Sequence, residues 1–82
     1  MGNRIATSGG TVVPAVLALE DSGYRVRELA GGLFEATSDQ GTYVAEDPVM
    51  LLGLIKLVEL RTWSWQPSDE EIDATLKRFG WT

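Results

Sequence analysis

A chain of 82 residues has room for one hydrophobic core and no second lobe. Hydrophobic residues make up 44% of it and charged residues 23%, which is ordinary for a soluble globular protein and excludes a disordered or fibrous class. The chain contains no Cys and no His. This excludes disulfides, thiol nucleophiles, imidazole bases and the usual zinc ligand sets, so we expect no enzyme, no cofactor and no metal.

The net charge of −5 disfavours binding to nucleic acid or to anionic lipid, because both are themselves negative. The longest apolar run covers residues 49–60 and is shorter than the roughly 20 residues that span a bilayer. No cysteine points to an oxidising compartment. We therefore expect a cytoplasmic protein without a membrane segment, of a size and composition typical of bacterial proteins.

The N-terminal residues 1–10 are small and polar and carry no apolar period, which predicts a flexible arm ahead of a single domain over residues 11–82. Thr11 is the expected N-cap of a first helix, and Gly23 is its expected left-handed stop. The β-branched valines within 11–22 leave a strand as the alternative for that segment.

From Tyr24 onward the apolar period changes to two, and residues 24–29, 33–37 and 42–46 read as three strands joined by short turns. Pairing them through these turns places Ala36 beside Val26 and Tyr43, and it places Arg27 opposite Glu35. The resulting meander has one face expected to meet the core: Tyr24, Val26, Phe34, Ala36, Tyr43 and Ala45.

Asp47 and Pro48 are typical of a helix N-cap and first helical position, and they predict a helix that continues to Arg61. Its polar positions form one thin stripe, and most of its surface is apolar. A helix of this kind is expected to be covered on more than one side. Gly53 costs about 1 kcal/mol relative to Ala inside a helix, which predicts that the first helix or a partner packs closely at that position.

Ser68 and Glu71 form a capping-box pattern that predicts a last helix with a narrow apolar stripe of Ile72, Leu76 and Phe79, ended by Gly80. Acidic residues crowd its first turns and basic residues its last, as the helix dipole favours. We interpret the acidic cluster as a solvated helix start and not as a metal site.

The predicted fold class is therefore α+β: a compact three-stranded antiparallel meander with helices packed on one face, in the order αβββαα. From Thr11 to Arg61 this order resembles that of double-stranded RNA-binding domains. The RNA contact of that family depends on lysines at the start of the helix after the sheet, whereas residues 46–50 read Glu-Asp-Pro-Val-Met. The resemblance implies a fold and no RNA-binding activity.

The predicted function is a non-enzymatic protein interaction module of accessory, regulatory or immunity type, with an unknown protein partner or a second copy bound through the 49–60 helix. Tryptophan is enriched at binding hot spots, and the 49–60 helix carries surplus apolar surface. We also expect at least one tryptophan to close the core between the last two helices. The candidate partner-binding residues are Trp63, Trp65, Trp81, Met50, Leu54 and Leu57.

The alternative function is nucleic-acid binding through Arg25 and Arg27, which project from one face of the first strand. Against it, strand parity places the neighbouring aromatic side chains on the opposite face, toward the core.

Overall fold

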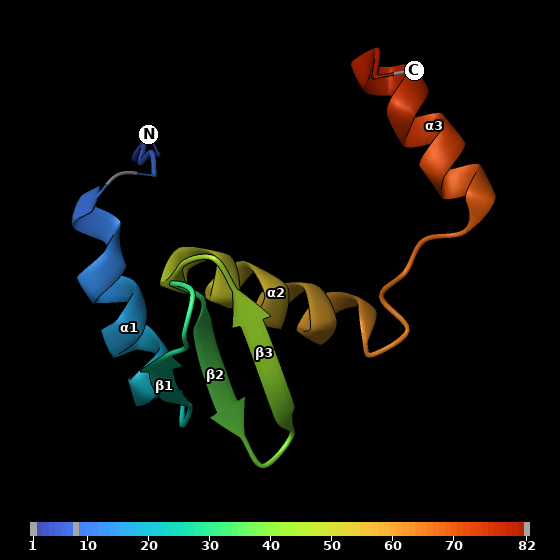
Figure 1. Cartoon of the computed structure of the whole chain (residues 1–82). Coiled ribbons are helices and arrows are strands. Elements are labelled where there is room, and N and C mark those ends of the chain that lie inside the picture. Colours follow the sequence, from blue (N-terminus) through green and yellow to red (C-terminus); the bar gives the residue numbers. More distant parts are fainter. Residues whose placement is uncertain (1, 8, 82) are drawn as a thin grey trace.

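A computed structural model describes residues 2–7 and 9–81. Three antiparallel strands form one sheet in the order β1-β2-β3, and the helices α1 and α2 cover one of its faces (Figure 1). The fold class and the element order predicted from the sequence are confirmed. The elements are a short 3-10 helix Gly9–Thr11, α1 Val12–Asp21, β1 Arg25–Glu28, β2 Phe34–Ser38, β3 Gly41–Ala45, α2 Pro48–Arg61 and α3 Asp69–Phe79.

The strand register agrees with the prediction in each pair that we named. Ala36 on the central strand faces Val26 on β1 and Tyr43 on β3, and Arg27 faces Glu35. The six side chains expected on the inner face all belong to the core or pack against it. Side-chain parity and turn length were therefore sufficient to set the register.

The first segment is a helix and not a strand, but its beginning differs from the prediction. Thr11 already has a helical backbone conformation as the last residue of the 3-10 helix, and its side chain makes no capping hydrogen bond. The end is as predicted: Gly23 has φ +93°, and its N–H donates to the Glu20 carbonyl at 3.0 Å. A second bond, from the Tyr24 N–H to the Leu19 carbonyl at 3.0 Å, completes a Schellman motif.

The core lies between the inner face of the sheet and the two helices. α1 contributes Ala15 and Leu19, and α2 contributes Leu51 and Ile55, whereas Val13 and Leu17 of α1 are exposed. Small side chains on α1 and on the central strand allow the helices to approach closely. The connected cluster of buried residues is Leu19, Ala36, Tyr43, Leu51 and Ile55.

α2 begins as predicted, because the Met50 N–H donates to Asp47 Oδ1 at 2.9 Å and Pro48 occupies the first turn. α3 is also capped as predicted: the Ser68 hydroxyl accepts from the Glu71 N–H, and the Glu71 carboxylate accepts from the Ser68 N–H. Both caps are short-range interactions that need no tertiary contact.

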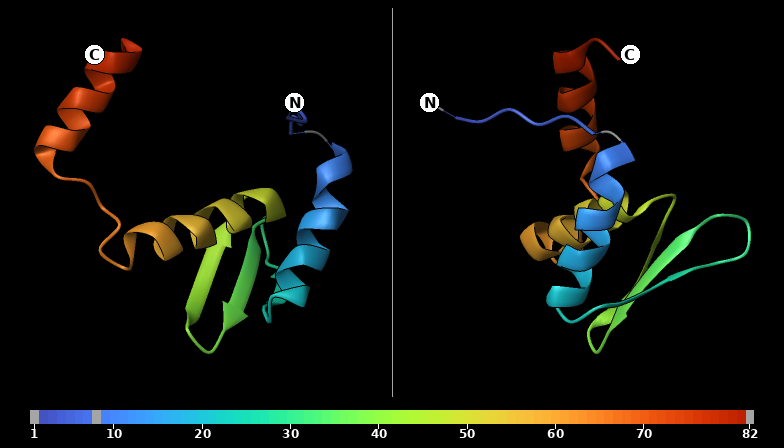
Figure 2. Two further views of the ribbon diagram at one scale, coloured as in Figure 1. Left: turned by 180° about the vertical axis from the view of Figure 1, so that it is seen from behind. Right: turned by 90° about the vertical axis from the view of Figure 1, so that its left-hand side faces the viewer.

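The helix α3 lies apart from the sheet and from the other helices (Figure 2). The packing between elements takes place among the 3-10 helix, α1, α2 and the strands. The radius of gyration is 15.1 Å, whereas a compact domain of this length has about 11.7 Å. The expectation of a compact fold is therefore wrong for the C-terminal part, because the apolar stripe of α3 does not turn back onto the chain's own core.

Candidate partner-binding surface

A shallow apolar groove lies between the end of the edge strand β3 and one side of α2. We call it the α2–β3 groove, and its lining residues are Val44, Ala45, Glu46, Met50, Gly53, Leu54 and Leu57. It forms because the buried side of α2 carries Leu51 and Ile55, which leaves the positions next to them facing outward beside β3. Glu46 is its one charged lining residue.

Several of the apolar residues that line the groove are exposed to solvent. The exposed fractions of Val44, Met50 and Leu54 are 44%, 49% and 37%, and Leu57 is half-buried. Clustered exposed apolar side chains mark contact surfaces more often than scattered single ones do. Of the residues proposed from the sequence, Met50, Leu54 and Leu57 therefore meet in one place.

Gly53 lies in the middle of this groove. No described atom outside its own helix lies within 4 Å of the position that a Cβ on Gly53 would take. Of the two expected occupants, the first helix is therefore wrong within the described residues, whereas packing of a partner at Gly53 stays a prediction. Because the residue has no side chain, the helix backbone is accessible at this point.

Trp63 packs at the edge of the core and not between the last two helices as we expected, and its side chain stays 58% exposed. Its ring stacks on Tyr43, with 5.5 Å between ring centroids and 19° between planes, and it lies against the backbone of Gly41. The ring therefore covers the β2–β3 turn and attaches the segment after α2 to the sheet.

The other two tryptophans lie elsewhere. The Trp65 carbonyl accepts a hydrogen bond from Arg61 Nε at 2.9 Å, and Trp81 stacks on Phe79 at 4.8 Å between centroids. None of the three tryptophans lines the groove, so the structure separates them from the α2 residues with which we grouped them. Sequence reasoning missed Val44 and Glu46 as groove residues, whereas Gly53 was expected to face the first helix or a partner.

A second apolar surface follows one side of α3. We call it the α3 stripe: Ile72 and Phe79 are 42% and 53% exposed, and Leu76 between them is half-buried. Because α3 has no substantial packing against the rest of the described chain, this stripe faces solvent. An amphipathic helix gains most of its stability when its apolar stripe is packed against another element. For α3 the described chain supplies no such element.

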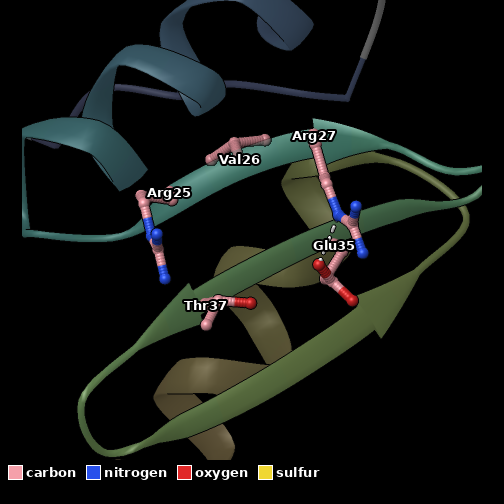
Figure 3. A pocket seen from close by; sticks show the side chains of 5 residues that line it. All are labelled: Arg25, Val26, Arg27, Glu35 and Thr37. Atoms are coloured by element: carbon pink, nitrogen blue, oxygen red, sulfur yellow. Dashed lines mark hydrogen bonds and ion pairs between the residues drawn. The ribbon is translucent and has the colours of Figure 1, made fainter.

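The outer face of the sheet carries the two arginines of the alternative function (Figure 3). Arg27 Nε lies 2.7 Å from Glu35 Oε1, and this hydrogen bond together with the carboxylate charge raises the pKa of Arg27. Arg25 lies beside Thr37 in the same shallow hollow, while Val26 points to the other side of the strand. One of the two cations is therefore already neutralised, and no aromatic side chain lines this hollow.

The carboxylates at the start of α3 serve the helix itself. The hydrogen bond from the Ser68 backbone, followed by the one from Arg61, lowers the pKa of Glu71. Lys77 Nζ pairs with Asp73 at 3.0 Å one turn later. In the part of the chain that the structure describes, no three acidic side chains converge on a metal-sized site, and no helix is long and apolar enough to cross a bilayer.

Comparison of the chain with protein-family models, with curated proteins and with solved structures gives no match in any of the three.

Proposed function

We propose that this protein is a non-enzymatic protein interaction module of the cytoplasm, of accessory, regulatory or immunity type, and that it binds its partner through the α2–β3 groove. The observation that supports this most is the clustering of Met50 and Leu54 as exposed apolar side chains around one accessible stretch of helix, beside the edge strand β3. The apolar centre of such a surface suits protein contact, since interface cores are depleted in charge.

The test compares two glutamate substitutions on apolar residues of similar exposure. Met50→Glu places a charge in the groove, whereas Leu17→Glu places one on α1, where Leu17 is 54% exposed. Both sites are helical and half-exposed, so neither variant should unfold the chain. A tagged chain and its two variants are incubated with a lysate of the native host and with a differently tagged second copy, and captured proteins are quantified.

We expect Met50→Glu to lose what the unmodified chain captures and Leu17→Glu to retain it, since a buried unpaired charge costs several kcal/mol. Equal capture by all three chains would place the contact elsewhere and overturn the role of the groove. If the unmodified chain captures neither a host protein nor its own copy, the proposed function is wrong.

The nucleic-acid alternative makes an opposite prediction. Binding through Arg25 and Arg27 must be strong at low salt and must fall steeply as salt rises, because it releases counterions from phosphates. We expect no such binding when labelled RNA and DNA are titrated with the chain at low salt. A salt-sensitive complex lost in Arg25→Ala would favour this alternative over protein binding.

A further inference from the structure

We propose that the occupant of the α2–β3 groove is α3 of a second copy of this chain, so that two copies exchange their C-terminal helices reciprocally. This inference rests on the proposed function and names the partner for the same surface. It pairs two apolar surfaces that the described chain leaves uncovered, and each copy supplies one of each.

The exposed area of the chain is what an exchanged dimer needs. Its accessible surface is 6565 Å², whereas a compact monomer of 9.0 kDa has about 4,850 Å². The excess of about 1,700 Å² per chain is more than the roughly 800 Å² that each partner buries in an interface of standard size. In the exchanged dimer each copy buries its own α3 stripe on its partner, and its groove is covered by the partner's α3.

The groove and the α3 stripe have matching periods. The large apolar residues of α2 that line the groove are Met50, Leu54 and Leu57, and those of the α3 stripe are Ile72, Leu76 and Phe79. Both sets follow the spacing i, i+4, i+7, which is about 10.5 Å along a helix. At Gly53 a helix backbone can approach closely, because nothing from the described chain occupies the space over it.

Charge selects the antiparallel direction. Glu46 lies at the N-terminal end of α2 in the groove lining, and Lys77 and Arg78 lie in the last turn of α3. An antiparallel α3 places Arg78 near Glu46, together with Lys77, which is paired with Asp73 of its own helix, and it places the acidic first turn away from Glu46. A parallel α3 would place the acidic turn beside Glu46 and would be opposed by like charge.

The chain's own α3 is directed away from its own groove by two attachments. Trp63 is stacked on Tyr43, and Arg61 binds both the Trp65 carbonyl and the Glu71 carboxylate, at 2.9 Å and 3.2 Å. With the connection held in this way, α3 leaves the end of α2 and extends away from the sheet (Figures 1 and 2). The groove therefore stays open to a helix from another molecule.

Another apolar hollow, between α1 and the start of α2, is the weaker candidate for this helix. Residues 5–7 of the N-terminal segment already line it, together with Pro14 and Val49. It is therefore partly occupied by the chain itself, whereas the α2–β3 groove is lined by β3, the residues that follow it and α2 alone.

The test uses the absence of cysteine from the chain. Gly53→Cys is made in one copy and Thr75→Cys, on the exposed side of α3 next to Leu76, in another. The two are mixed and oxidised, and disulfides are read on a non-reducing gel. The matched control replaces Gly53→Cys by Lys56→Cys. Lys56 is exposed on α2 and lies outside the groove lining.

Exchange predicts a mixed disulfide between positions 53 and 75, in a yield about tenfold or more above the Lys56→Cys control, because docking raises the effective concentration of the two thiols. Self-linkage of Gly53→Cys copies or of Thr75→Cys copies would show a dimer of another arrangement and overturn the exchange. A chain carrying both substitutions that links within one molecule would show α3 on its own groove, which also overturns it.

The two proposals fail in different ways. If the mixture gives no specific disulfide while the unmodified chain still captures a host protein in a Met50-dependent manner, the exchange is wrong and the interaction module stands. If neither occurs, both are wrong.

Discussion

Removing the Trp63 ring tests whether this residue holds the connection after α2 to the sheet. Its side chain is 58% exposed, so about two-fifths of its surface is covered. That fraction of the roughly 250 Å² that a tryptophan can bury is about 100 Å², or about 2.5 kcal/mol at 25 cal/mol per Å² as an upper value. The stack on Tyr43 adds about 0.5–1.5 kcal/mol. Because a compact unfolded chain already covers roughly 10–40% of the buried area, we expect Trp63→Ala to lower the free energy of unfolding by about 2–4 kcal/mol in total.

Thermal unfolding followed by far-UV circular dichroism measures this cost as a fall in Tm of roughly 10–30 °C. The matched control is Trp81→Ala, whose ring stacks on Phe79 at the end of α3 and is 68% exposed. Because α3 has no substantial packing against the sheet or the other helices, the control should leave the main transition within about 1 kcal/mol. Equal losses for the two variants would refute the role assigned to Trp63.

Four further predictions concern the body of the fold and the cap of α3. A Cβ at Gly41 would lie 2.8 Å from the Trp63 ring, so Gly41→Ala should displace the ring and shift tryptophan emission to longer wavelength; an unchanged spectrum would contradict the stack. Leu51→Ala should cost about 2–5 kcal/mol in urea denaturation, because Leu51 is fully buried, and a cost below about 1 kcal/mol would contradict its place in the core. Burial raises the pKa of Tyr43 above its ordinary 10.0, so stability present below pH 10 is lost as pH rises through the higher folded value, and Tyr43→Phe should remove that part of the alkaline loss. Ser68→Ala should cost about 0.5–2 kcal/mol of helix stability. NMR chemical shifts should then show reduced helicity of α3, and unchanged shifts would contradict the capping role of Ser68.

Features that depend on neighbours in the sequence were predictable. The Asp47 cap, the capping box at Ser68 and the left-handed glycines each involve a few adjacent residues. The capping side chains bond to nearby backbone N–H groups, and glycine adopts a positive φ without steric cost. The strand register was predictable for a related reason, since short turns and a period of two leave one pairing that places Ala36 and Tyr43 in the core.

Features that depend on distant parts of the chain were not predictable. The α3 stripe satisfies the pattern of a core helix, so the sequence indicates that it is covered without indicating by what. For the same reason Gly53 predicted close packing by the first helix or by a partner without indicating which, and the described chain leaves the position open. The tryptophans lie in one region of the sequence, yet Trp63 stacks on the sheet and Trp81 stacks on α3. Their ring contacts depend on the path of the connecting segment, which the sequence does not indicate.

The central claim is that the α2–β3 groove and the α3 stripe meet between two copies, and the mass of the unmodified chain in solution tests it most directly. Sedimentation equilibrium over a wide range of concentration should give about 18 kDa, twice the 9.0 kDa of one chain, as a closed dimer requires. The Met50→Glu variant should give the mass of one chain. A mass of 9.0 kDa for the unmodified protein at every concentration would contradict the claim.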